Sequence, residues 1–255
     1  SNNWLKDFIK TDLATDKIGA FLTDIGLEVE GIEKFESVKG SLEGIVVGKV
    51  LTCEQHPNAD KLKKTTVDIG GGQILEIVCG APNVAAGQTV PVAVIGTKIY
   101  AKDGSAFEMK EAKIRGEKSQ GMICAEDELG LSDDHGGIMV LDEEIYQVGE
   151  PFAKYFNLTN DEVYEIGLTP NRTDAMSHYG VARDLHAFLS TNGLKSEFEK
   201  VSTALVSTEG EHGFELEVED GALCPRYIGA VIENVKISES PEWLKDRLKA
   251  IGLSP

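Results

Sequence analysis

The sequence predicts an α+β protein of several domains, built around a small closed β-barrel between about Leu42 and Leu141. Three observations support this prediction. Apolar and polar residues alternate over short runs within that stretch, as in half-buried strands. Turn-forming segments such as His56–Asp60, Gly70–Gly72 and Gly80–Asn83 separate the runs. Short strands at close spacing indicate a barrel of about five strands, and apolar residues at helical spacing lie outside it.

Composition indicates an ordinary soluble chain. Its 255 residues, 41% of them apolar, can bury a sizeable core in one or two domains. No apolar run approaches the ~18 residues that cross a bilayer, and no basic segment followed by an apolar one opens the chain. A cytoplasmic protein without a membrane partner is therefore expected. The four cysteines are widely spaced and are expected to be reduced.

The net charge of −18 weighs against strong nucleic-acid binding, because Lys and Arg dominate contacts to phosphate. The acidic residues are unevenly placed, however, and many of those in the barrel stretch follow Glu126. Before that point the stretch is near neutral, with bases grouped at Lys61–Lys64 and at Lys110–Lys118. This pattern permits a weak, local RNA contact.

The chain before the barrel is expected to begin with a short amphipathic helix over Asn3–Lys10. Thr15 is expected to cap a second helix, which Gly26 ends in the left-handed conformation. A strand from Leu27 to Phe35 follows.

After the barrel, whose last strand is expected at Gly137–Leu141, the sequence predicts a strand over Val163–Thr169 and a helix that starts at Ser177. A polar linker then leads to two further strands near Phe214–Val218 and Tyr227–Ile232, and to a helix after Pro241. Two strands and one helix cannot bury their own faces, so this last domain is expected to continue beyond Pro255.

Four motifs of the barrel stretch resemble the tRNA-binding OB-fold module of aminoacyl-tRNA synthetases and their accessory factors. They are HPNADKL (56–62), VCGAPNV (78–84), VAVIG (92–96) and RGEKSQGMICAEDELGL (115–131). Segments on both sides resemble, in the same order, the β-subunit family of bacterial phenylalanyl-tRNA synthetases. These segments are Asn3–Leu13, Leu22–Glu33, Leu168–Phe188 and Pro241–Pro255.

The resemblance implies a domain organisation that the residues alone do not establish. Residues 1–40 and 151–193 would form one discontinuous α+β domain, with the OB-fold barrel of residues 41–150 inserted in it. Residues 194–212 would be a linker. Residues 213–255 would begin an editing-type domain that is truncated here.

The resemblance also implies a function. The family's enzyme is a cytoplasmic α2β2 heterotetramer that joins phenylalanine to tRNA(Phe) with ATP and magnesium, and its α subunit holds the aminoacylation site. This chain would contribute tRNA binding and scaffolding, without a catalytic site, metal or cofactor of its own. Editing residues would lie beyond Pro255.

Candidate tRNA contacts combine cations with a hydroxyl, amides and a methionine, a set that can meet phosphate, 2′-hydroxyl and a stacked base. The resemblance points to Ser119 and Met122 in particular. The candidates are His56, Lys61, Asn83, Lys113, Arg115, Lys118, Ser119 and Met122.

Structural explanations stay open for several of these residues. His56 could pack against a turn formed by Asn58 or Asp60, and Cys79–Asn83 could be a structural turn. The barrel could then be a purely structural module for assembly, without an RNA partner. Outside the barrel, pairing with carboxylates or backbone groups is a better explanation of Arg172 than a contact with tRNA or another subunit.

Other chemistry finds little support. A zinc site at Cys53 and His56 lacks two further ligands at compatible spacing. Asp133–Gly137 is expected to be a solvated loop, since no regular carboxylate spacing follows it. The sequence contains no nucleophile elbow and no phosphate-binding loop of the Gly-x-x-x-x-Gly-Lys type.

Overall fold

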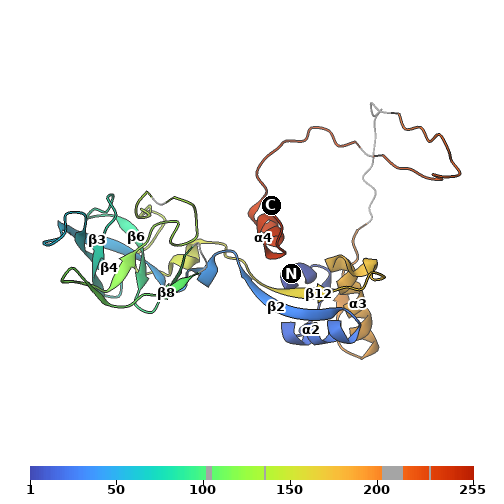
Figure 1. Ribbon diagram of the computed structural model, residues 1–255, viewed down its shortest axis with the longest axis horizontal. Coiled ribbons are helices and arrows are strands. Elements are labelled where there is room, and N and C mark those ends of the chain that lie inside the picture. The colour runs from blue at the N-terminus through green and yellow to red at the C-terminus, as the bar shows by residue number, and fades with distance from the viewer. Residues whose placement is uncertain (102–104, 135, 203–214, 230) are drawn as a thin grey trace. The chain divides into compact units, whose positions relative to one another are not determined.

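A computed structural model describes residues 1–101, 105–134, 136–202, 215–229 and 231–255. The chain divides into two compact units (Figure 1). The first comprises Ser1–Asn2 and Val29–Ile166, and it contains the barrel. The second comprises Asn3–Glu28 and Gly167–Pro255.

The barrel is a five-stranded antiparallel sheet in the order β11-β6-β3-β4-β5, which confirms the predicted fold class. Its strands are β3 (Ile45–Gln55), β4 (Lys63–Asp68), β5 (Ile74–Cys79), β6 (Thr89–Val94) and β11 (Gly121–Ile123). The long strand β3 pairs with both β4 and β6, and its register with β4 shifts between Val50 and Thr52. Such a bulge bends the strand, and the bend helps β3 to pair with β4 and β6 in a curved sheet.

The sheet closes on itself where β5 meets the corner between β10 (Glu117–Ser119) and β11. No strand ladder joins the two sides of this seam in the described residues. Instead the N–H of Gln120 donates to the carbonyl of Glu76 (2.8 Å), and the N–H of Val78 donates to Ser119 Oγ (3.2 Å). The barrel is therefore nearly closed, and a serine side chain supplies part of the closure.

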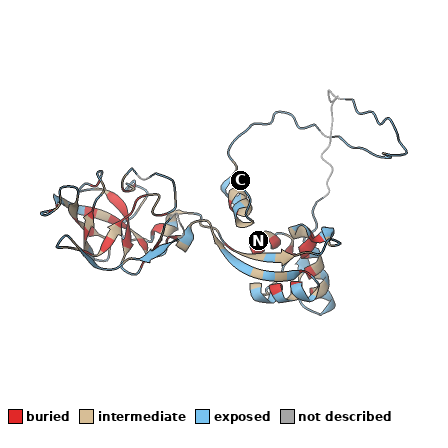
Figure 2. Cartoon of the chain, viewed as in Figure 1, coloured by how far each residue is buried: buried red, intermediate tan, exposed pale blue. Residues whose placement is uncertain are grey.

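The barrel core follows the alternation of the sequence, with buried residues along the strands (Figure 2). The fully buried members include Val47, Val50, Val67, Ile77, Val90 and Val92. Thr65 occupies an inward position on β4, and its Oγ1 donates to the carbonyl of Ile77 (2.8 Å). A threonine is tolerated there because its hydroxyl is satisfied within the barrel.

Two short hairpins lie in the connection from β6 to β11. They pair β7 (Lys98–Tyr100) with β8 (Ala106–Glu108), and β9 (Ala112–Ile114) with β10. The prediction of a strand at Gly137–Leu141 was wrong, because in the described residues this segment forms no strand ladder and contains an isolated bridge from Leu141 to Thr89. The backbone N–H and carbonyl of Ile138 are both hydrogen-bonded to the side-chain amide of Asn83. This amide takes the place of a neighbouring strand at that residue.

Outside the barrel, the first unit contains most of a two-stranded ribbon. Its strands are β2 (Glu28–Glu36) and β12 (Asn160–Gly167). Two 3₁₀ segments, η1 (Lys39–Leu42) and η2 (Phe152–Tyr155), lie between this ribbon and the barrel in the chain. Phe152 is fully buried in a cluster with Val47 and Leu42, which fixes the chain where it enters and leaves the barrel.

The second unit is built on α2 (Thr15–Asp24) and α3 (His178–Thr191). The helix expected from Ser177 is present as α3, and Ser177 caps it, since its side chain accepts from the N–H of Gly180 (3.1 Å). The cap expected at Thr15 was wrong: Ala14 occupies that position, without a side-chain hydrogen bond. Gly26 follows α2 at φ +84°, the left-handed conformation that the sequence predicts.

The N-terminal helix is shorter than the periodicity predicts. It ends as α1 (Asn2–Leu5), and β1 (Ile9–Lys10) then pairs with β13 (Glu197–Phe198). Ile9 is buried in this arrangement. Pairing between distant segments thus overrides the helical pattern locally.

Among its described residues, the C-terminal part has the helix α4 (Glu242–Ala250). The strands expected near 214–218 and 227–232 are absent from the described residues 215–229 and 231–240, while Phe214 lies outside them. Apolar residues such as Ile228 and Ile232 are exposed there, so these segments lack the buried face that stabilises a strand pair. Within the described ranges, no helix has the length and apolarity needed to cross a membrane.

Candidate nucleic-acid interface

The turn between β3 and β4 is organised by His56, which is only 3% exposed. The N–H of Asn58 donates to His56 Nδ1 (3.0 Å), so Nδ1 is an acceptor and the ring proton resides on Nε2. His56 Nε2 then donates to the carbonyl of Ile114 (3.1 Å). The imidazole therefore connects this turn to the β9–β10 hairpin, and both of its nitrogens are engaged inside the protein.

Arg115 occupies the tip of that hairpin. Arg115 and Gly116 both have positive φ, +49° and +99°, as the two central residues of a type I′ turn do. Asparagine and glycine favour such positions, whereas a left-handed arginine is uncommon. Asn58 Nδ2 donates to the Arg115 carbonyl (3.5 Å) and supports the turn. The hairpin thereby holds a cationic side chain out toward solvent.

The cations of the two segments divide into paired and unpaired groups. Lys64 pairs with Glu117 (2.6 Å), and this hydrogen-bonded pairing raises the pKa of Lys64 and lowers that of Glu117. Lys118 pairs with Glu111 (3.3 Å). Among the described residues, no carboxylate lies within salt-bridge distance of the exposed side chains of Lys61, Lys113 and Arg115, hereafter the tip cations.

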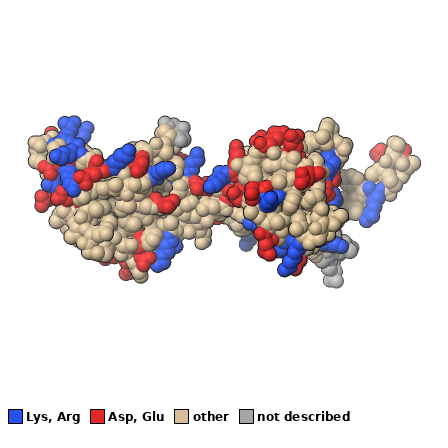
Figure 3. All heavy atoms as spheres, turned by 90° about the horizontal axis from the view of Figure 1, so that it is seen from below, with Lys and Arg blue, Asp and Glu red and all other residues tan. Residues whose placement is uncertain are grey.

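Figure 3 shows Lys and Arg side chains gathered at the end of the barrel that carries the β3–β4 turn, with acidic side chains among them. The acids partly neutralise this end. The surface that remains positive is therefore small, which suits a local contact with phosphate better than a long nucleic-acid track.

Ser119 lies inside the protein, with an exposed fraction of 3%. Its Oγ accepts from the N–H of Val78 (3.2 Å) and donates to the carbonyl of Gly121 (3.1 Å). The hydroxyl therefore closes the barrel seam and has no proton left to offer an RNA strand.

The amide of Asn83 is used in a similar way. Its Nδ2 donates to the carbonyl of Ile138 (2.8 Å), and its Oδ1 accepts from the N–H of the same residue (2.9 Å). A Cβ added at Gly137 would lie 2.2 Å from Asn83 Oδ1, so glycine makes this close approach possible. The side chain of Asn83 thus satisfies the backbone groups that a neighbouring strand would otherwise bind.

Met122 is half-buried and lines a pocket of about 460 Å³ beside the seam. Further apolar walls come from Ala81, Met109 and Ile114, and Lys110 lies at the rim. Of the predicted contacts, only Ser119 and Met122 line this pocket.

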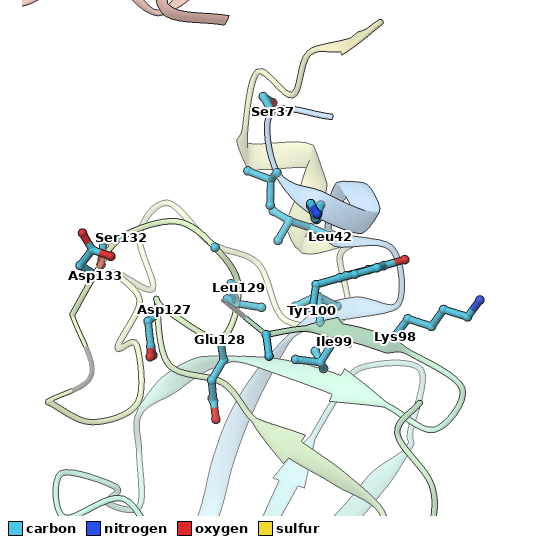
Figure 4. A pocket seen from close by; sticks show the side chains of 15 residues that line it. Ser37, Leu42, Lys98, Ile99, Tyr100, Asp127, Glu128, Leu129, Ser132 and Asp133 are labelled. Carbon is cyan, nitrogen blue, oxygen red and sulfur yellow. The ribbon is translucent and has the colours of Figure 1, made fainter. Parts of the chain in front are cut away.

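A second pocket of about 350 Å³ lies between η1, β7 and the loop after β11 (Figure 4). Tyr100 and Leu129 contribute apolar surface, and Asp127 and Asp133 contribute carboxylates. Because acidic side chains repel phosphate, this pocket is a poor candidate for a nucleic-acid contact.

Other candidate centres have structural partners. Arg172 binds Asp174 (3.1 Å) and Asp184, and Arg183 also binds Asp174 (2.8 Å), so the pairing predicted for Arg172 is present. Burial raises the pKa of the Cys79 and Cys124 thiols. No group of three or more potential ligands for a metal occurs among the residues that the structure describes, and His135 lies outside them.

Comparison with known proteins agrees with this geometry. Residues 45–150 match the family described as "Putative tRNA binding domain". The whole chain is 50% identical to the phenylalanine–tRNA ligase β subunit of Bacteroides thetaiotaomicron and 48% identical to that of Porphyromonas gingivalis, covering 31% of each. Over its whole length the chain is thus similar to a part of the phenylalanine–tRNA ligase β subunits.

The chain spans about a third of the length of these ligase β subunits. Among solved structures, the MetRS related protein from Pyrococcus horikoshii is 25% identical over 41% of this chain and 84% of that one, with a TM-score of 0.30. A TM-score this low does not bear on the fold.

Sequence reasoning missed two residues that position the barrel tip. Gln120 joins the seam through both its backbone N–H and its side chain, and Glu117 pairs with Lys64. Both lie within the motif that contains Arg115, but nothing in their residue type distinguishes a seam contact from an RNA contact.

Proposed function

We propose that this chain is a tRNA-binding and scaffolding part of a phenylalanine–tRNA ligase β subunit. The observation that carries the proposal is the identity of 50% over the whole chain with a protein of that name. Because the match includes the segments on both sides of the barrel, it is more specific than a shared OB-fold module alone would be.

The barrel tip would contact RNA through the tip cations. Their side chains are exposed and are not neutralised by a described carboxylate, so they can release counterions from phosphate. Three such contacts give weak binding with a modest salt dependence. They also give little sequence preference, since phosphate contacts position a protein without specifying bases.

The wider setting follows from the same homology. The chain would work in the cytoplasm, within an α2β2 assembly whose α subunit catalyses the attachment of phenylalanine to tRNA(Phe) with ATP and magnesium. Residues 1–40 with 151–193 would form the domain that holds the barrel of residues 41–150. Residues 194–212 would then lead to an editing-type domain that begins at residue 213.

Titration of the folded chain with labelled tRNA(Phe) and with a non-cognate tRNA, at low and at moderate salt, tests the RNA-binding role. We expect both tRNAs to bind with similar, weak affinity that falls as salt rises. Absence of binding to either tRNA at low salt would overturn the role in RNA binding.

The second candidate is a structural module that assembles with the α subunit or with the rest of the β subunit. It is supported by His56, Asn83 and Ser119, whose polar groups are all used inside the barrel. Co-purification with an α subunit, combined with no tRNA binding at low salt, would favour this candidate.

A further inference from the structure

The pocket beside the seam exists because the barrel closes there without a continuous strand ladder. Ser119 and Gln120 make the hydrogen bonds across the seam, and β11 contains only three residues. Apolar side chains next to these contacts are left without a covering strand. The resulting pocket, of about 460 Å³, lies in the size range of small-molecule sites.

The walls of this pocket suit a flat, apolar ring. They come from separate segments of the chain: the turn after β5, the β8–β9 connection, β9 and β11. The apolar residues that face it include Ala81, Pro82, Met109, Ala112, Ile114 and Met122. Methionine is flexible and polarisable, so two of them can adapt to different aromatic rings.

The charged side chains around the pocket would orient a bound ligand. Glu128 is one of the residues that line the pocket, and one of its carboxylate oxygens accepts from the N–H of Ala125 (2.7 Å). A carboxylate in this position repels phosphate. Lys110 lies on the rim without a described ion pair, and Lys113 and Arg115 follow on the adjoining hairpin. A ligand with an uncharged ring and an attached anion would therefore enter ring first.

We propose that this pocket receives one unstacked nucleobase of RNA, with the adjoining phosphate bound by Lys110 and Lys113. The inference rests on the proposed RNA-binding function and adds to it a preference for unpaired nucleotides. A duplex cannot supply the ring, because its bases are stacked and paired, whereas a loop or a single-stranded end can.

A pair of substitutions at Ala112 tests the pocket without changing a cation. Ala112→Leu places a larger side chain into the pocket from an exposed strand position, and Ala112→Ser is the control of similar size. The probes are a single-stranded RNA of about eight nucleotides with one central 2-aminopurine, and a blunt RNA duplex of the same length. Binding and 2-aminopurine fluorescence are measured at one salt concentration, with thermal unfolding as a check on folding.

We expect Ala112→Leu to weaken single-strand binding about tenfold, the equivalent of one lost base-stacking contact, and to abolish the fluorescence change. Duplex binding should stay within twofold, and Ala112→Ser should behave like the original chain. Equal single-strand binding by both variants would overturn the base pocket while the RNA-binding function stands, as would an equal loss on both probes. If the original chain binds neither probe nor tRNA, the RNA-binding function fails, and the base pocket fails with it.

Discussion

The candidate RNA contacts of the barrel include two sets of polar residues that differ in where their polar atoms are directed. His56, Asn83 and Ser119, here called the internal set, bind backbone groups of neighbouring segments. The tip cations, two of which lie in the same motifs, are exposed without a described carboxylate partner. The comparison teaches that one motif can contain both buried polar residues that hold the barrel together and exposed cations that stay available to a ligand.

If this division is correct, substitutions in the two sets should have different effects on stability and on RNA affinity. Substitutions in the internal set should lower stability, and they should affect RNA binding only through the fold. Substitutions of the tip cations should leave stability nearly unchanged and lower RNA affinity directly. The predictions below are ordered by the expected effect on stability.

His56→Ala should have the largest effect. It removes a buried ring and two hydrogen bonds, and it leaves the N–H of Asn58 without its acceptor. We expect the free energy of unfolding to fall by about 3 kcal/mol, measured by urea denaturation. Lys61→Ala in the same turn is the control and should change it by less than about 0.5 kcal/mol. Unchanged stability in His56→Ala would remove His56 from the internal set.

Ser119→Ala should have the next largest effect. The substitution leaves the N–H of Val78 without its acceptor at the seam. We expect a loss of about 1 to 2 kcal/mol in unfolding free energy, and faster hydrogen exchange at Val78. Retained exchange protection at Val78 together with a large loss of RNA affinity would instead indicate direct contact between Ser119 and RNA.

Asp174→Asn probes the second unit, where Asp174 forms ion pairs with Arg172 and Arg183. The hydrogen bond from Arg172 holds the pKa of Asp174 below its usual range. A carboxylate with a lowered folded-state pKa stabilises the fold above its unfolded pKa, near 4, and loses that contribution as pH falls through the folded value.

Denaturation at several pH values should therefore show Asp174→Asn less stable than the original chain at pH 7. The difference should shrink as the pH falls below about 4. Binding of tRNA should not change at neutral pH. A difference in stability that is constant with pH would contradict the pairing.

Arg115→Asn should have the smallest effect on stability and a clear effect on RNA. Asparagine favours the left-handed conformation that Arg115 adopts, so stability should rise or stay within about 0.5 kcal/mol. We expect RNA affinity to fall several-fold, and the slope of log affinity against log salt to become shallower by about 1. An unchanged salt slope would show that Arg115 does not meet phosphate.

The sequence predicted the barrel well because alternating residues and turn formers report directly on half-buried strands. The helix from Ser177 and the left-handed Gly26 were also predicted, since capping depends on local residue types. The short β1 and the missing strand at Gly137–Leu141 could not be predicted, because each depends on a partner distant in sequence: β13 for β1, and Asn83 for Ile138.

The candidate site was predictable only in part. Motif resemblance pointed to two segments, and the structure brings these two together through the hydrogen bond between His56 and Ile114. A serine or an asparagine turns inward where a backbone group from a distant segment needs a hydrogen-bond partner. Residue type alone does not show where such backbone groups will lie. The RNA contacts proposed for individual residues stay predictions.

The most direct test compares two variants with the same change in net charge. One combines Lys61→Ala, Lys113→Ala and Arg115→Asn. The control combines Lys17→Ala, Lys195→Ala and Lys200→Ala, three exposed lysines of the second unit without a described ion pair. We measure the affinity of each for tRNA(Phe) at several salt concentrations.

The account predicts that the control stays within about twofold of the original chain. The tip variant should lose about thirtyfold at low salt, with a salt slope shallower by two to three. Equal binding by the two variants would contradict the claim that the barrel tip contacts RNA.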